Sequence, residues 1–158
     1  AQNIFINGNI DESMVKFERV LDDYPNTPGA LQSLVYLLNE AISNNDVDKV
    51  IKLLSDNDGT INDPNILSAI YKLRGDIHID QDDHSSALKY YQKAQSVMDV
   101  NSFKTRYQLD IASTLLAQDN YEDALKTLKE IIDNENIGFR EKNQAEELMA
   151  YTKQKMGI

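Results

Sequence analysis

Both histidines of this chain lie in one short stretch, HIDQDDH, which runs from His78 to His84. Three aspartates, Asp80, Asp82 and Asp83, stand between them. Imidazole and carboxylate groups are ligands for zinc and manganese, and imidazole also exchanges protons near neutral pH. The stretch is therefore a candidate metal or acid–base site, with an ordinary polar turn as the alternative.

A second stretch, SDNDGTI from Ser55 to Ile61, has the middle of a calcium-loop pattern, with two aspartates before a glycine and an isoleucine. Both ends of that pattern fail. Leu54 stands where the first ligand belongs, and Asn65 replaces the glutamate that would bind through both oxygens. A solvated loop is the better interpretation of this stretch.

The common signatures of catalysis do not occur in the sequence. It has no glycine-rich phosphate loop, no G-x-S-x-G and no HExxH, and no grouping of serine, histidine and aspartate stands out. We therefore predict a protein that is not an enzyme and that has no catalytic residues, cofactor or bound metal.

The composition excludes several further classes of protein and partner. The 158 residues are 41% hydrophobic and 27% charged, which is ordinary for a folded protein. A net charge of −10 repels phosphate backbones and anionic membranes, so nucleic acid is not an expected partner. Without cysteine there are no disulfides or thiolate metal sites. No apolar run approaches the roughly 20 residues of a membrane helix, and no targeting segment is recognised.

The clearest signal is an internal repeat with a period of 37 residues. Three columns of small or apolar residues keep this spacing: Ser13, Val50, Ala87, Ala124; Met14, Ile51, Leu88, Leu125; and Phe17, Leu54, Tyr91, Leu128. Few prolines and no alternating β-branched stretches argue against strands. Thr27-Pro28 and Asp63-Pro64 are typical helix starts. Each period is thus predicted to be helix A, a tight polar turn and helix B.

The repeat changes the interpretation of HIDQDDH. His78 occupies the position of Ile4, Ala41 and Leu115 in the other repeats, and His84 that of Ile10, Val47 and Tyr121. Both rings should therefore be packed between helices A and B, and the aspartates should form the turn. We favour this structural interpretation over a metal site. The two imidazoles could also meet across the turn, in which case acid would lower the stability of the protein.

The third repeat resembles the tetratricopeptide repeat family. Tyr71, Gly75, Ala87, Tyr91 and Ala94 have the family's spacing, and Pro25 closes the first unit. The resemblance implies an all-α, right-handed superhelical solenoid of about four helix-turn-helix units. These are residues 1–25, 28–58, 63–99 and 101–136, with a C-terminal capping helix at 139–156 in one domain, 1–158. Ala1 has a mid-helix position, so we expect the native protein to continue upstream. Gly75 is small so that its helices can approach closely.

Tetratricopeptide arrays are scaffolds that bind other proteins or peptides, so the resemblance implies an interaction module. Its concave face would present helix A residues: Val35, Asn39, Ile42, Lys72, Asp76, Ile79, Arg106, Leu109 and Ser113. The alternative is that some of these side chains are simply solvated or covered by the last helix. Only Lys72 and Arg106 are basic where relatives bind acidic chaperone tails, so this chain does not resemble that subgroup.

Two segments, FERVLDDYPNTPGAL and LDIASTLLAQDNYEDALKTLKEII, resemble membrane-anchored bacterial envelope proteins that accompany the Sec translocon. That resemblance implies a chaperone-like domain on the periplasmic side of the inner membrane, held by an anchor outside this sequence. The fragment itself is not expected to insert into a membrane. The alternative is a soluble cytoplasmic adaptor that holds a protein assembly together. The oligomeric state stays open.

Overall fold

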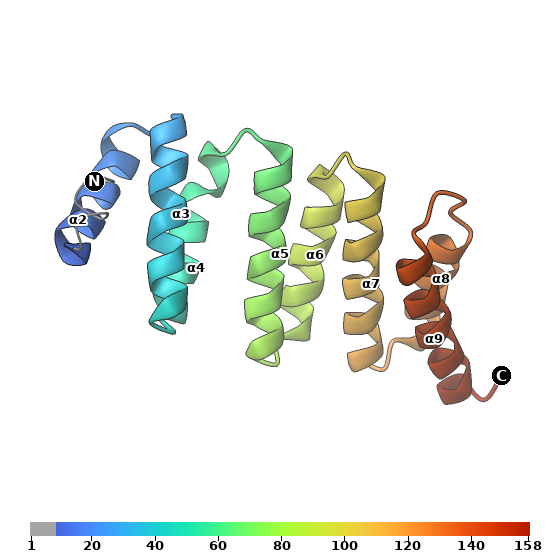
Figure 1. Ribbon diagram of the computed structural model, residues 1–158. Helices are drawn as coiled ribbons and strands as arrows, with labels where there is room; N and C mark the ends of the chain where they lie inside the picture. Colours follow the sequence, from blue (N-terminus) through green and yellow to red (C-terminus); the bar gives the residue numbers. More distant parts are fainter. Residues whose placement is uncertain (1–8) are drawn as a thin grey trace. The chain divides into compact units, whose positions relative to one another are not determined.

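The computed structural model describes residues 9–158, apart from the side chains of Ile10 and Ser102. Within this range eight α-helices and one short 3₁₀ helix follow one another, without a β-strand (Figure 1). The prediction of an all-α helical repeat is confirmed. The chain forms two compact units, Ala1–Asp63 and Pro64–Ile158, each with its own hydrophobic core. The predicted first helix A, which would hold Ala1 and Ile4, lies outside the described residues.

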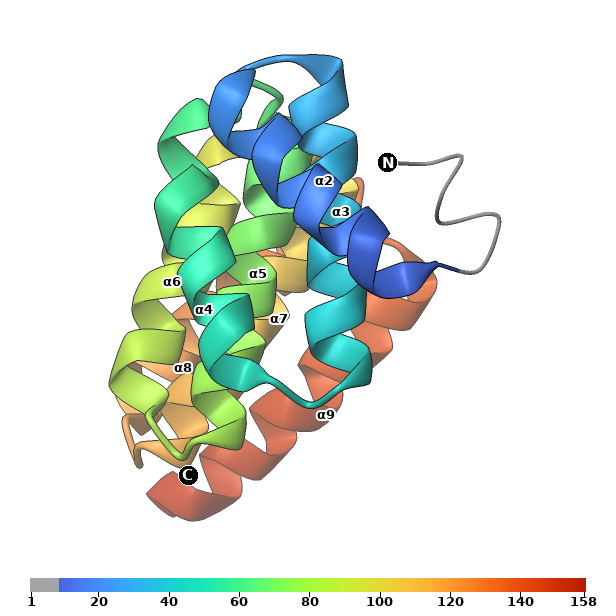
Figure 2. The same cartoon turned by 90° about the vertical axis from the view of Figure 1, so that its left-hand side faces the viewer.

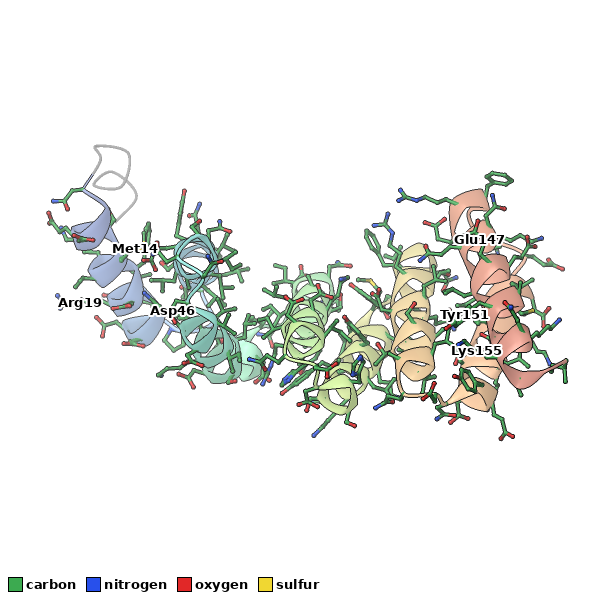
Figure 3. The ribbon with its side chains drawn as sticks, turned by 90° about the horizontal axis from the view of Figure 1, so that it is seen from below. Met14, Arg19, Asp46, Glu147, Tyr151 and Lys155 are labelled. Atoms are coloured by element: carbon green, nitrogen blue, oxygen red, sulfur yellow. The ribbon has the colours of Figure 1, made fainter. Side chains whose placement is uncertain are left out.

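The first unit contains α2 (Ile10–Asp23), α3 (Pro28–Ser43), α4 (Val47–Asn57) and the 3₁₀ helix η1 (Asp58–Thr60). Figure 2 shows α2 lying across α3. Met14, Phe17 and Leu37 form the buried cluster between these two helices, and the ring of Phe17 stacks on Tyr36 at 4.6 Å. In Figure 3 Met14 stands on the side of α2 that faces α3.

The second unit contains α5 (Pro64–Asp80), α6 (His84–Val97), α7 (Asn101–Ala117), α8 (Tyr121–Ile132) and α9 (Phe139–Met156). Consecutive helices pack against one another, and α9 also packs against α7. Leu109, Ala112, Leu128, Ile131 and Ala145 form a cluster that joins α7, α8 and α9. The exposed side of α9 carries charged residues together with the exposed rings of Phe139 and Tyr151, and Lys155 lies over the ring of Tyr151 (Figure 3). None of the described helices is long and apolar enough to cross a bilayer.

The turn between the helices of each pair has the same backbone in three places. Asn45, Asp82 and Asp119 are 37 residues apart and adopt left-handed φ values of 54°, 60° and 57°. Glycine, asparagine and aspartate tolerate this conformation better than other residues do. The following amide donates to the carbonyl five residues earlier, at 2.8 to 2.9 Å: Asp46 to Ala41, Asp83 to His78, and Asn120 to Leu115.

The residue after each left-handed position caps the next helix. Side-chain oxygens of Asp46, Asp83 and Asn120 accept from the amides of Lys49, Ser86 and Asp123, at 3.0, 3.0 and 3.4 Å. Asn9, one period before Asp46, caps α2 by accepting from Glu12 at 3.3 Å. These bonds satisfy amides that would otherwise lack a partner within the helix. The residues that form the turn and cap the next helix thus recur with the same 37-residue period as the apolar residues.

Gly75 lies where α5 approaches α6. A β-carbon at this position would come within 2.4 and 2.6 Å of two ring carbons of Tyr91. On the facing helix Ala87 and Ala94 are fully buried. The small residues of the repeat therefore permit the close packing of its two helices, as expected from the sequence.

We expect Gly75→Leu to lower the free energy of unfolding by about 1–3 kcal/mol, because the new side chain must displace the Tyr91 ring. Urea denaturation followed by circular dichroism measures this change. Gly59→Ala is the matched control, since a β-carbon at Gly59 meets no atom within 4 Å. An unchanged unfolding midpoint in Gly75→Leu would contradict the close approach.

The left-handed turn leads to a second prediction, at Asn45. Asn45→Gly should raise the thermal midpoint slightly, because glycine adopts positive φ without a steric cost. Asn45→Val should destabilise the protein by roughly 1–2 kcal/mol, because a β-branched residue is strained at this φ. Calorimetry of both variants shows whether the thermal midpoint rises with glycine and falls with valine. Equal midpoints for the two variants would rule out a left-handed turn.

Candidate functional site

The residues expected on the concave face are divided between the two units. In the first unit Val35, Asn39 and Ile42 lie along α3 at helical spacing, so they share one side of the helix. Val35 is 48% exposed and Ile42 is 47% exposed, and Asn39 is exposed between them. This part of the surface is an accessible, largely apolar stripe.

In the second unit Lys72 and Asp76 anchor a polar network between three helices. Lys72 Nζ donates to both carboxylate oxygens of Asp76 at 2.8 Å and lies 3.9 Å from Asp110 on α7. The Tyr91 hydroxyl of α6 donates to Asp76 at 2.8 Å. Burial and this bond to a carboxylate raise the pKa of Tyr91, so the hydroxyl remains a donor.

Beside this network lies an open hollow of about 270 Å³ between α5, α7 and α9. Its lining combines both charges with an apolar residue: Lys72, Arg106, Leu109, Asp110, Arg140, Glu141 and Gln144. Arg106 Nε is 3.9 Å from Glu141, a loose ion pair. The structure therefore brings Lys72, Arg106 and Leu109 together, while Val35 and Asn39 belong to the other unit.

Leu109 is a residue to which the stated alternative, cover by the last helix, applies. Its side chain is only 4% exposed and belongs to the core cluster with Ala145 of α9. Leu109 shares its repeat position with Val35 and Lys72, both of which are more exposed. The difference arises because α9 covers this part of α7, so Leu109 is a wall of the hollow and not a free contact residue.

Three lining residues of α9, Arg140, Glu141 and Gln144, were missed by the sequence analysis. The sequence predicts that Phe139–Met156 is a cap, and a cap is not expected to contribute to the binding surface. The segment follows α7 at about one 37-residue period, where a fifth helix A would stand, and this spacing is the signal that identifies them. The helix that closes the core also supplies part of the candidate surface.

Asp110 is the perturbed acid of the hollow. Partial burial raises the pKa of its carboxyl, and nearby Asp76 acts in the same direction. Lys72 and Arg106 oppose the shift but do not cancel it. An acid with a raised pKa in the folded state costs stability once it ionises. The ionised carboxylate of Asp110 thus lowers the stability of the folded protein.

Asp110→Asn should therefore stabilise the protein at pH 7, and the advantage should disappear below about pH 3.8, where the unfolded-state carboxyl is also protonated. Urea denaturation of both proteins at several pH values measures this difference. Glu147→Gln on the exposed side of α9 is the control, because it removes the same charge from an acidic protein. An Asp110→Asn variant that is less stable at pH 7 would contradict the direction of the shift.

The structure assigns Asp82 and Asp83 of HIDQDDH to the turn between α5 and α6, whereas Asp80, also expected in the turn, is the last residue of α5. Asp82 is the left-handed residue, and Asp83 caps α6. A hydrogen bond with Ser86 is the main cause that lowers the pKa of Asp83. Among residues 9–158 no group of three or more histidine and acidic side chains is arranged to hold a metal ion.

The two histidines are packed on the helix pair but keep some solvent access, with side-chain exposures of 21% and 25%. The His78 ring stacks on Tyr90 at 5.3 Å. Its Nδ1 lies 3.3 Å from Asp83 but outside hydrogen-bond geometry, and the Nδ1 of His84 lies 3.5 Å from Asp82. Each imidazole thus has an aspartate of the turn beside it. The acid sensitivity of this turn stays a prediction.

The calcium-like stretch forms the end of α4 and η1. Asp56 is an ion-pair partner of Lys52 at 2.5 Å. Asn57 is turned inward, and its amide donates to the carbonyl of Leu53 at 2.8 Å. Asp56 and Asn57 therefore make their contacts within the C-terminal part of α4.

Comparison with known proteins extends this description. No protein-family model and no curated protein sequence matches the chain. Among solved structures it is similar to a Podosopora anserina putative kinesin light chain with nearly identical TPR-like repeats, with a TM-score of 0.68, 14% identity, and coverage of 99% of this chain and 82% of the other. A second crystal structure of the same description gives a TM-score of 0.67, 14% identity, and coverage of 99% and 83%. The likeness shows the fold: this chain has the helical architecture of TPR-like repeat proteins.

Proposed function

We propose that this protein is a non-catalytic scaffold that holds another protein or a peptide on the surface formed by α5, α7 and α9 of its second unit. The observation that carries the proposal is the hollow between α5, α7 and α9. It offers cations, carboxylates, an amide and an apolar wall within one open depression. Such a mixture suits a polypeptide, which presents backbone donors and acceptors together with varied side chains.

The charges of the hollow support a binding role. Lys72 is held by Asp76, but Arg106 is 58% exposed and only loosely paired with Glu141. Arg140 is also exposed on the same lining. Exposed guanidinium groups beside a partly buried carboxylate provide donors of fixed geometry for a partner. Fold-level likeness to repeat proteins agrees with this role, although a fold alone does not assign a function.

The setting of this scaffold is a further part of the proposal. From the sequence resemblance we propose that the domain works on the periplasmic side of a bacterial inner membrane and contacts exported or partly folded proteins. The alternative is a cytoplasmic adaptor. The coding sequence upstream of Ala1 separates them: about 20 apolar residues preceded by lysine or arginine favour the anchored protein, and further repeats favour the adaptor.

Site-specific photocrosslinking tests the proposed surface. A crosslinking amino acid at Lys72 or Arg140 should yield an adduct with a defined partner in cell envelopes. The same amino acid at Lys126, exposed on α8, is the control and should not yield it. Adding Arg106→Glu should remove the adduct, because the charge of the hollow is inverted. No specific adduct from either position, or one that survives Arg106→Glu, would contradict binding in this hollow.

A further inference from the structure

A second depression lies in the first unit, remote in sequence from the hollow of α5, α7 and α9. It is a cavity of about 230 Å³ between the end of α2, the start of α3 and residues 60–63. Its apolar lining includes Leu21, Ala30, Leu31, Leu34 and Ile61. Apolar cavities of roughly 150 Å³ already hold benzene, so this one has room for one large apolar side chain.

The cavity adjoins a second hollow, and the two share Leu21 and Thr60 in their linings. Glu18, Asp22 and Asp56 line this neighbouring hollow together with Lys49 and Lys52. Both lysines have acidic partners: Lys52 is held by Asp56, and Lys49 by Glu40 at 3.0 Å. Glu18 is left with a long contact of 3.8 Å to Lys49. On this side, the rim of the apolar cavity is therefore lined by three acidic and two basic side chains, a net negative charge.

The distribution of charge along the chain points the same way. Residues 1–63 contain four basic and eleven acidic side chains, a net charge of −7. Residues 64–158 contain twelve basic and fifteen acidic side chains, a net charge of −3. Most of the negative charge thus belongs to the smaller unit. Its field attracts cationic groups and disfavours anionic ones.

We propose that the first unit is a docking site for a basic segment of a partner protein that inserts one large apolar side chain into the cavity. The apolar residue provides a buried anchor, and flanking lysines or arginines face Glu18 and Asp22. Anionic peptides and nucleic acids are repelled by the same rim. This site uses different helices from the proposed scaffold surface, and it would give the protein two docking sites of different chemistry.

Fluorescence anisotropy with the whole chain tests the proposal. The probe is a labelled twelve-residue peptide with one phenylalanine flanked by four lysines in a glycine and serine background. Matched peptides carry alanine in place of phenylalanine, or glutamate in place of the lysines. We expect the first peptide to bind, each matched peptide to bind at least tenfold more weakly, and raised salt to weaken binding. Equal binding of the alanine or glutamate peptide, or no binding of the first, overturns the proposal.

Variants of the protein locate the binding. Asp22→Lys should weaken binding at least fivefold, whereas Asp11→Lys makes the same change of net charge on α2 outside the hollow and should leave binding unaltered. Leu31→Ser and Ile61→Ser each remove apolar lining and should weaken binding, with folding checked by circular dichroism. An equal loss in Asp22→Lys and Asp11→Lys would show general charge attraction and overturn a defined site.

The two proposals fail separately. Peptide binding that is sensitive to Asp22 and Leu31 supports this site even if crosslinking at Lys72 and Arg140 recovers nothing. Conversely, specific crosslinks at those two positions with no peptide binding would leave the scaffold proposal intact and overturn the second site.

Discussion

The turn between paired helices is the constraint on which the rest of this structure depends. Each described turn combines a left-handed asparagine or aspartate with a following side chain that caps the next helix. This backbone reverses the chain within a few residues and satisfies the amides at the new helix start. The reversal brings the paired helices close together, so that Gly75 packs against the ring of Tyr91. Turn chemistry and close packing are thus two parts of one repeated unit.

The candidate surface follows from how the last repeat is closed. A repeat stack leaves an apolar side uncovered at its end, and here α9 covers it with Ala145 over Leu109 and Leu128. The same helix places Arg140 and Glu141 at the edge of α7, where they border the hollow with Arg106. The helix that buries Leu109 therefore also forms one side of the charged hollow. The polar network around Asp76 fixes the other wall, because Lys72 and Tyr91 both donate to its carboxylate.

The two units offer different surfaces for recognition. The first is strongly acidic and has an apolar cavity beside Glu18 and Asp22. The second has nearly balanced charge and a hollow lined by both cations and carboxylates. Charge of one sign steers a partner of the opposite sign, whereas mixed charge favours geometric selection. In the proposed scaffold, the first unit would thus select basic partners, and the second unit would select partners whose geometry fits its mixed charges.

The sequence by itself determined the helices, their turns and the tight approach at Gly75, because these depend on local hydrogen bonds and on residues that recur every 37 positions. It also indicated that HIDQDDH contains the turn of its helix pair, since Asp82 and Asp83 align with Asn45 and Asp46. Only the tertiary structure decided that Leu109 is buried, that the Tyr91 hydroxyl of α6 donates to Asp76 of α5, and that residues 60–63 close a cavity against α3. Burial and hydrogen bonds between helices depend on which distant helices meet, and a repeat pattern treats equivalent positions alike even where a final helix covers one of them.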